Sequence, residues 1–181
     1  PDLAGRLCVT GDDCAGYDFV ADAISGADGD GIDADPTDPG GVSLSGAVEF
    51  HGTRVAGILG AVGNNSTGVA GVDWTARIMP VRVFGNGLGT SYDVIQGVRF
   101  AAGLSNDSLT VPIQPAKVLN LSLGGTGYSQ VEQDLYNQLY AAGIFSIAAA
   151  GNNSNNIPLY PASYAGVVSV SAVDNGKNLT S

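Results

Sequence analysis

The chain has 181 residues, of which 44% are hydrophobic and 13% charged, and its formal net charge is −10. This length suits one domain with a substantial core, and the acidic balance argues against nucleic-acid binding, which relies on basic stripes. No apolar run approaches the ~18 residues that a membrane-spanning helix needs. The composition therefore indicates a globular protein of an extracellular kind, or one that holds cations through its carboxylates.

The first fifty residues are polar and rich in Gly and Asp, with little periodicity, and we expect a long surface loop region there. Cys8 and Cys14 lie within it in the stretch CVTGDDC, close enough for a small local disulfide around a turn. Such a bond would suit an oxidising compartment. Two free thiols are the alternative, whereas a zinc site is not indicated, because no histidine or third cysteine lies nearby.

Beyond about residue 75, apolar runs alternate with amphipathic ones. This alternation predicts βαβ units and a parallel sheet covered by helices. Four strands and two helices are expected, the strands at 76–84, 116–124, 144–151 and 166–174 and the helices at 91–103 and 129–143.

Both predicted helices have recognisable ends. The first is expected to use Ser91 as its N-cap and to end at Gly103. The second is expected to open with a capping box between Ser129 and Glu132 and to end at Gly143.

Binding sites in parallel sheets lie at the carboxyl ends of the strands. Three stretches rich in small residues follow predicted strands: FGNGLGTS, SLGGTG and AAAGNNSNN. The first is a poor nucleotide site, because its glycines do not follow G-x-G-x-x-G and no acidic residue follows the next strand to hold a ribose. The favoured alternative is that an extended peptide pairs with these glycine-rich edges as an added strand.

Two residues could carry chemistry at this edge. His51 is the only histidine and precedes a run of small residues that predicts a tightly packed helix, although a lone histidine is ordinarily a surface or buried residue. Asn152 follows a predicted strand and could donate its amide to a developing oxyanion, although a turn residue is the alternative. A proton carrier and an oxyanion donor together indicate acyl transfer.

Taken together, these stretches resemble the subtilisin-like serine proteases. HGTRVAGILGAVGNNSTGVAGV resembles their histidine block, NLSLGG their substrate-pairing strand and AAAGN their oxyanion block, while YPASYAGVVSVSAVD and PDLAGR resemble neighbouring stretches. The order matches the family's along nearly the whole chain. The resemblance implies a three-layer α/β fold with a mostly parallel central sheet and helices on both faces, of which residues 1–181 would be the incomplete central portion of one catalytic domain.

The resemblance implies an endopeptidase with a Ser-His-Asp triad. His51 would be the general base and then the general acid, and Asn152 would donate to the tetrahedral intermediate. Val55, Ala56 and Ile58 would begin a buried helix behind the histidine.

Further residues are implied to bind the substrate. Two backbone edges would pair with the peptide, and three small residues would line the pocket for the side chain before the scissile bond. The edge residues are Gly87, Leu88, Gly89, Ser122, Leu123 and Gly124, and the pocket residues are Ala149, Ala150 and Gly151.

The stretch GNNSTGVAG resembles the family's tight calcium loop. The implied ligands are the side chains of Asn65 and Asp2 and the backbone carbonyls of Gly63, Thr67 and Val69, a mixed set of hard oxygen donors. A plain Asn-rich turn is the alternative.

A second acidic stretch spans 28–40 and departs from the EF-hand pattern, because Ile32 stands where the fifth-position ligand belongs. Similar loops in some secreted bacterial members can hold calcium, and a bare solvated loop is an equal alternative. The candidate ligands are Asp28, Asp30, Asp33, Asp35 and Asp38.

The family's aspartate and serine blocks are expected before Pro1 and after Ser181, so we expect this chain alone not to cleave peptides. The parent is expected to be a secreted monomeric protease with structural calcium and an N-terminal pro-segment, acting on polypeptides and not on nucleic acid or within a membrane. Two other functions remain open: a catalytically dead homologue that binds peptides, and a calcium-stiffened scaffold.

Overall fold

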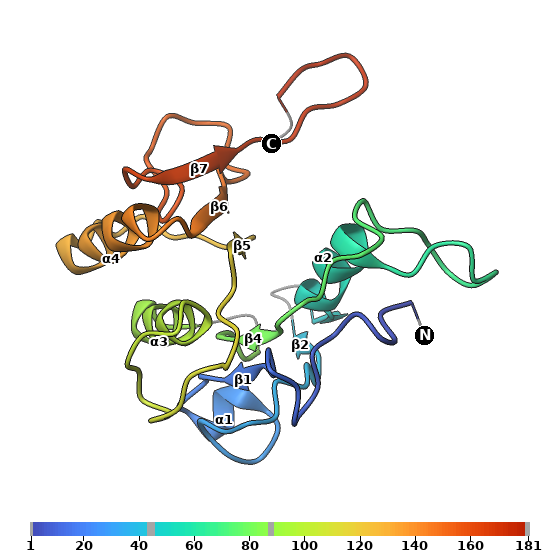
Figure 1. Ribbon diagram of the computed structural model, residues 1–181. Coiled ribbons are helices and arrows are strands. Elements are labelled where there is room, and N and C mark those ends of the chain that lie inside the picture. Colours follow the sequence, from blue (N-terminus) through green and yellow to red (C-terminus); the bar gives the residue numbers. More distant parts are fainter. Residues whose placement is uncertain (1, 43–45, 87–88, 180–181) are drawn as a thin grey trace. The chain divides into compact units, whose positions relative to one another are not determined.

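The computed structural model describes residues 2–42, 46–86 and 89–179. The chain divides into two compact units, Pro1–Pro115 and Ala116–Ser181, and each is considered by itself (Figure 1). Both contain helices and short parallel strands, so the predicted α/β class is confirmed. None of the described helices is long and apolar enough to cross a membrane.

In the first unit, strand β1 (Tyr17–Asp18) pairs in parallel with β4 (Val81–Arg82). The strand predicted over 76–84 is therefore much shorter than expected. Pro80 explains the difference, because its nitrogen carries no hydrogen to donate to a sheet. Its carbonyl oxygen still accepts a hydrogen bond from the Tyr17 N–H at 3.1 Å.

Aromatic rings beside β1 form part of this unit's core. The ring centroids of Tyr17, Phe19 and Phe100 lie 5.4, 5.2 and 5.5 Å apart, and Phe19 is 0% exposed. Rings of this size bury a large apolar area at favourable separations. The prediction of a surface loop is thus wrong for residues 17–20. This apolar run is too short, within a polar stretch, to show the alternation of a strand.

Helix α3 (Ser91–Ala101) is the first predicted helix, but its N-cap is Thr90 rather than Ser91. The Thr90 hydroxyl accepts the Asp93 N–H at 3.0 Å, and the Asp93 carboxylate accepts the Thr90 N–H at 3.4 Å. This reciprocal capping box satisfies two helix-end donors. Gly103 follows the helix at φ +72°, as predicted for its end.

In the described part of the chain between β1 and the histidine, the structure has three short elements. Helix α1 (Ala23–Gly26) begins after Asp22, whose carboxylate accepts the Ser25 N–H at 3.2 Å. Strands β2 (Gly41–Val42) and β3 (Val48–Glu49) pair in antiparallel fashion and lead into the next helix.

Helix α2 (His51–Gly60) is not the tightly buried helix that the small residues predict. Ile58 is 69% exposed, Val55 and Ala56 are half-buried, and Gly60 is the helix's only buried residue. Other described residues pack against the C-terminal end of α2, where Gly71 lies too close to the backbone to allow a side chain. The rest of the helix surface is left largely exposed.

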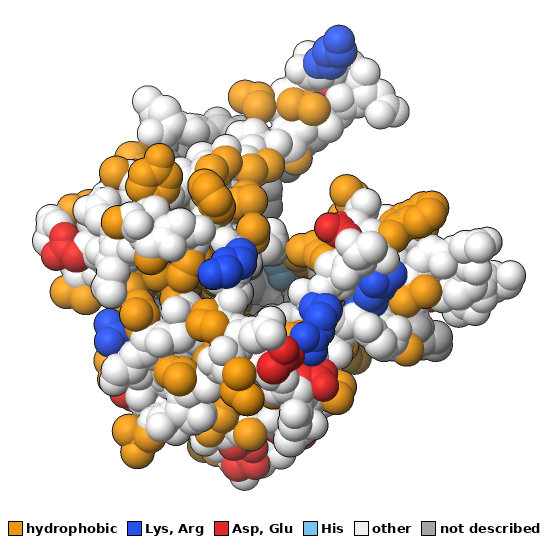
Figure 2. Space-filling view, in the orientation of Figure 1, with side chains coloured by type: hydrophobic (Ala, Val, Ile, Leu, Met, Phe, Trp, Pro, Cys, Tyr) orange, Lys and Arg blue, Asp and Glu red, His pale blue; other side chains and the backbone are white. Residues whose placement is uncertain are grey.

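Large apolar side chains are exposed at several other places, and many are visible as orange atoms in Figure 2. They include Trp74, Leu109, Val168 and Val170, which are 61%, 94%, 51% and 51% exposed. The apolar surface of strand β7 and of the segment after α2 is therefore not fully covered by the described residues.

Up to residue 179, the second unit contains one helix and three parallel strands in the order β5-β6-β7. The elements are β5 (Val118–Leu121), α4 (Gln130–Ala141), β6 (Phe145–Ala149) and β7 (Val167–Val170). These match the predicted elements within a few residues at each end.

Burial alternates along β5, where Leu119 and Leu121 are buried and Val118 and Asn120 are exposed. One face of the sheet thus packs on α4, while the described part of this unit leaves the other face open. The buried side chains on the packed side include Leu135, Tyr136, Leu139 and Ala148.

Only half of the predicted capping box forms at α4. The Ser129 hydroxyl accepts the Glu132 N–H at 3.4 Å, but the Ser129 N–H donates to the Tyr164 hydroxyl at 2.9 Å instead of to Glu132. A tertiary contact therefore replaces the local one. Gly143 ends the helix region at φ +74°, as predicted.

Candidate active site

His51 is the first residue of α2, and its side chain is exposed. The helix starts without a side-chain cap: the N-cap is Phe50, whose carbonyl accepts the Arg54 N–H at 3.0 Å. Among the described residues, no hydrogen bond involves the imidazole ring. The ring is thus accessible at a helix N-terminus, where it can exchange protons with a bound molecule.

The acidic loop is tied to the same end of α2. The Thr53 hydroxyl donates to the Asp38 carboxylate at 3.1 Å, and the same carboxylate accepts the Gly40 N–H at 2.9 Å. Gly40, at φ +86°, lies so close to Val48 and Phe50 that a side chain would crowd them. Sequence reasoning missed this contact, since no motif links residues so far apart.

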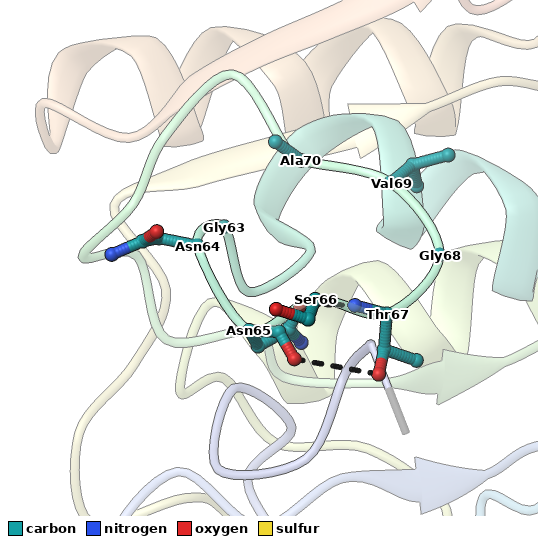
Figure 3. A pocket seen from close by; sticks show the side chains of 8 residues that line it. All are labelled: Gly63, Asn64, Asn65, Ser66, Thr67, Gly68, Val69 and Ala70. Atoms are coloured by element: carbon teal, nitrogen blue, oxygen red, sulfur yellow. Dashed lines mark hydrogen bonds between the residues drawn. The ribbon is translucent and has the colours of Figure 1, made fainter.

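Residues 63–70 wind into a tight turn around a hollow that all eight of them line (Figure 3). The Asn65 amide oxygen accepts the Thr67 N–H at 3.1 Å, and the Thr67 hydroxyl lies 3.4 Å from the Asn65 carbonyl oxygen. Asn64 and Ser66 adopt left-handed backbone angles, φ 58° and 57°. The sequence left two alternatives for this stretch, a plain Asn-rich turn and a calcium loop. The observed backbone is compatible with both.

Asp2 reaches this turn from the start of the chain. Its carboxylate accepts the Val69 N–H at 3.0 Å, and its carbonyl accepts the Val62 N–H at 2.7 Å. A side chain at Gly68 would overlap the carboxylate, so glycine makes room for it. The other carboxylate oxygen, Oδ1, is buried and has no hydrogen-bond partner among the described residues. Such an oxygen is costly to bury unless a cation or donor meets it.

The remaining oxygen atoms around the turn are of the type that binds hard cations. In the described part of the chain, the carbonyl oxygens of Gly63, Thr67 and Val69 accept no hydrogen bond. With the Asp2 carboxylate and the Asn65 amide oxygen, they form an all-oxygen set of the kind calcium prefers. All five predicted ligands therefore belong to one turn or contact it.

The acidic loop is less well formed as a cation site. Four of its carboxylates line one hollow, those of Asp28, Asp30, Asp33 and Asp35. The charge of Asp33 raises the pKa of Asp30, whereas the Thr37 hydroxyl lowers the pKa of Asp35. Over residues 2–42, 46–86 and 89–179, no three His, Cys, Asp or Glu side chains gather as a metal-binding group. A second calcium in this loop stays a prediction.

A buried arginine that the sequence reasoning missed holds the start of this loop. Arg82 on β4 pairs with Asp18 and Asp28 and donates to the Gly26 carbonyl. Burial raises the pKa of Asp18 to about 6, although the Val20 N–H and Arg82 act to lower it. The sequence did contain a signal for it, a basic residue inside the apolar run MPVRVF. Such a residue indicates a buried charge, and a buried charge requires partners.

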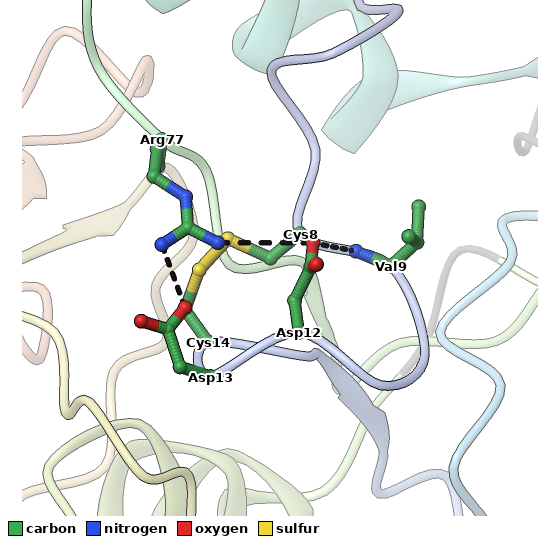
Figure 4. The surroundings of a disulfide bond; sticks show 6 residues. All are labelled: Cys8, Val9, Asp12, Asp13, Cys14 and Arg77. Carbon is green, nitrogen blue, oxygen red and sulfur yellow. Dashed lines mark hydrogen bonds and ion pairs between the residues drawn. A yellow bond between two sulfur atoms is a disulfide. The ribbon is translucent and has the colours of Figure 1, made fainter.

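Cys8 and Cys14 are joined by a disulfide with their Cα atoms 5.5 Å apart (Figure 4). Neither residue is a free thiol. Arg77 binds the closed loop from outside, with Nη1 2.6 Å from Asp13 Oδ1 and Nη2 3.7 Å from Asp12 Oδ2. Such an exposed ion pair contributes only ~0–1 kcal/mol, so the covalent bond is the main constraint on this loop.

One predicted substrate edge lies mostly outside the described residues, since Gly87 and Leu88 fall there. Gly89 follows them and passes so close to the Phe84 ring that a side chain would overlap it. The close approach explains the glycine without any ligand.

The other predicted edge, Ser122 to Gly124, directly follows β5 at the carboxyl end of the sheet. Ser122 and Leu123 are half-buried and Gly124 is exposed. The backbone groups of Leu123 and Gly124 form no hydrogen bond with any described residue. They are therefore available to pair with another extended chain.

The oxyanion block follows the neighbouring strand β6. Ala149 and Ala150 are half-buried, and Asn152 is exposed just beyond them. Gly151 takes φ +100°, and a side chain there would overlap Leu159. The chain turns away from the sheet at Gly151, and Asn152 is exposed. His51 and the predicted calcium ligands belong to the first unit, whereas Ser122–Gly124 and the oxyanion block belong to the second.

Glu132 is a buried acidic residue, 8% exposed, that sequence reasoning treated only as a cap. Burial raises its pKa, and a hydrogen bond with Tyr164 offsets part of that rise. The charged form of Glu132 is therefore disfavoured in the folded protein.

We expect Glu132→Gln to stabilise the fold at pH 8 but not at pH 4. Because the folded-state pKa lies above the ordinary value of 4.5, the carboxyl contributes most stability when protonated and loses it as the pH rises through the raised value. Glutamine does not titrate, so the variant escapes that loss. Thermal melting of both proteins from pH 4 to 8 measures the difference, and a difference independent of pH would contradict the prediction.

The chain matches the family model described as the subtilase family over residues 18–181. It is 38% identical over 169 residues to an extracellular protease of Xanthomonas campestris and 37% identical over 182 residues to thermitase of Thermoactinomyces vulgaris. These alignments cover 87% and 100% of this chain, but 29% and 53% of the relatives.

Among solved structures, a match to proteases from Pseudoalteromonas arctica has a TM-score of 0.85 and 36% sequence identity. It covers 95% of this chain and 52% of that one. The chain thus spans about half, or less, of the length of these relatives.

Proposed function

Because this chain belongs to the subtilase family, we propose that the protein containing it is a serine endopeptidase in which His51 carries the proton and Asn152 stabilises the oxyanion. The family match over residues 18–181 carries the proposal, since it includes both residues. Their exposed positions, at the start of α2 and just after β6, support it.

In the proposed reaction, a serine outside this chain attacks the peptide carbonyl carbon while His51 accepts its hydroxyl proton. The Asn152 amide donates to the carbonyl oxygen as negative charge develops there. His51 then gives its proton to the leaving amine, and water hydrolyses the acyl-enzyme by the same steps. An aspartate outside this chain would orient the imidazole, so we expect the 181-residue chain alone to be inactive.

The substrate is proposed to be an extended polypeptide. Its backbone would pair with Leu123 and Gly124, whose hydrogen-bonding groups are unused among the described residues. Ala149, Ala150 and Gly151 would line an open, apolar pocket for the side chain before the scissile bond. Gly87, Leu88 and Gly89 would form the opposite edge, and Ser122 would extend the first.

Calcium is proposed to bind the turn at 63–70 through Asp2, Asn65 and three backbone carbonyls. The buried, unpaired oxygen of Asp2 supports this proposal, because a bound cation would satisfy it. The ion would be structural, holding the start of the chain against the turn that follows α2.

We expect Asp2→Asn to weaken calcium binding by about tenfold or more, since a buried carboxylate is the strongest ligand of the set. The rise in Tm that calcium produces should shrink accordingly. The asparagine can still accept the Val69 N–H, so the turn itself is kept. Asp134→Asn, at an exposed site on α4, is the matched control. An undiminished calcium-dependent rise in Asp2→Asn would contradict the assignment.

Secretion is proposed from two observations. Relatives in Xanthomonas campestris and Dichelobacter nodosus are named as extracellular proteases. The Cys8–Cys14 disulfide also suits an oxidising compartment. The precursor would carry a pro-segment and the mature protein would act as a monomer.

A fluorophosphonate probe tests the proposed function directly, because it labels an activated serine. The full-length protein and the 181-residue chain are treated in parallel, with and without a calcium chelator, and read by intact mass. One adduct on the full-length protein and none on the chain is the expected result. A folded, calcium-bound full-length protein without an adduct would instead favour a catalytically dead peptide-binding homologue.

A further inference from the structure

We propose that Tyr164 is a positioning residue for the peptide-binding edge formed by Leu123 and Gly124, acting through Tyr160 and Gly125. The inference rests on the proposed function, because it concerns how that edge is held. All of the residues involved lie in the second unit.

Backbone hydrogen bonds between Gly125 and Tyr160 hold the C-terminal end of this edge. Gly125 donates its N–H to the Tyr160 carbonyl at 2.9 Å and accepts the Tyr160 N–H at 2.8 Å. Gly124 passes so close that an added Cβ would lie 3.1 Å from the same carbonyl oxygen. Tyr160 therefore sets the position of the chain immediately after the two residues whose backbone groups are free to pair.

Tyr160 is in turn held by an aromatic cluster. Its ring centroid lies 4.6 Å from that of Tyr164 and 5.5 Å from that of Tyr128. The Tyr164 ring stacks on Tyr136 at 5.5 Å, and both of these side chains are 2% exposed. Tyr164 is thus the buried member that joins the edge to the core of the unit.

The segment that carries Tyr164 is bound to the first turns of α4. Its hydroxyl accepts the Ser129 N–H at 2.9 Å. The next residue, Ala165, donates its N–H to the Gln133 side chain at 3.0 Å and accepts that side chain's amide at 3.1 Å. A rigid helix end therefore determines where the Tyr160 backbone lies, and through it the peptide-binding edge.

This arrangement predicts a selective effect on substrates. A displacement of the edge misaligns a peptide that pairs with it, and small misplacements of a bound substrate are costly for the reaction. A substrate too short to pair with the edge binds without it, so a displacement of the edge should not change how fast that substrate is cleaved. A merely structural role for Tyr164 would instead lower the activity on both substrates alike.

The test compares kcat and KM of the full-length protein on two substrates, a tetrapeptide anilide and a single acylated amino-acid ester with the same residue before the scissile bond. In Tyr164→Phe, loss of the hydroxyl contacts with Ser129 and Glu132 should lower the advantage of the tetrapeptide in kcat/KM by about fivefold, mainly through KM. The ester should be cleaved as in the wild type. Tyr140→Phe, on α4 and 61% exposed, is the matched control and should change neither value.

Gln133→Ala is the second variant, because it loosens the same segment without altering a tyrosine. It should reduce the tetrapeptide advantage in the same direction. An unchanged advantage in both variants, or an equal loss on both substrates, would overturn the positioning role while the proposed protease function stands. A wild-type protein that cleaves neither substrate would instead overturn the proposed function, and the inference with it.

Discussion

Replacing His51 with alanine in the full-length protein is expected to lower kcat for peptide hydrolysis by about 10⁶-fold, the scale known from subtilisin itself, a member of the same family. Without the imidazole, no group is placed to take the serine proton or to return it to the leaving amine. The residual rate would come from the oxyanion donors and from substrate binding. Steady-state hydrolysis of a peptide anilide measures the loss.

The same variant should melt at the wild-type temperature in calcium. His51 is exposed and makes no hydrogen bond with the described residues, so its removal leaves no buried partner unsatisfied. Arg54→Ala, one turn further along the same exposed surface, is the control and should retain activity. If His51→Ala lost calcium-dependent stability together with activity, the residue would be structural.

Replacing Asn152 with alanine is expected to lower kcat by about 10²- to 10³-fold, again a magnitude taken from subtilisin rather than derived from this structure. The amide would act on the oxyanion, which exists only as the transition state is approached. Substrate binding, and therefore KM, should change little. Full kinetic curves on one peptide substrate separate the two parameters.

Asn153→Ala is the matched control, since Asn153 is the adjacent exposed residue of the same type. It should keep a kcat near that of the wild type. Equal losses in the two variants would indicate that the turn after β6, and not the Asn152 amide, is what the reaction requires. A rise in KM alone would place Asn152 in ground-state binding.

Local chemistry made the second half of the fold predictable. Helix α4 and its neighbouring strands lie close to the expected ranges. The signals that predict them, apolar periodicity and the helix-ending Gly143, depend only on residues that are close in sequence. The predicted N-cap of α3 was wrong because two local signals competed there. Thr90 and Ser91 are both good caps, and only the reciprocal bond with Asp93 decides between them.

Candidate site residues could be proposed from the sequence where a motif carries them, and not where distant residues meet. His51, Asn152 and the turn at 63–70 could be proposed from short stretches of sequence, and their roles stay predictions. The partners of Arg82 and the contacts of Tyr164 come from segments brought together by folding, so a local pattern could at most indicate that Arg82 is buried and could not identify these contacts. Tertiary contact likewise replaced half of the predicted α4 capping box.

The closed loop between Cys8 and Cys14 bears on how long the proposed protease would survive in the presence of other active copies of itself. A protease of this kind would cut segments that can be drawn out into an extended strand along its cleft. The disulfide holds the ends of this loop 5.5 Å apart at Cα, far less than an extended chain of that length would span. A loop closed in this way cannot be drawn out along such a cleft, so for the proposed protease we expect this exposed part of the surface to resist self-digestion.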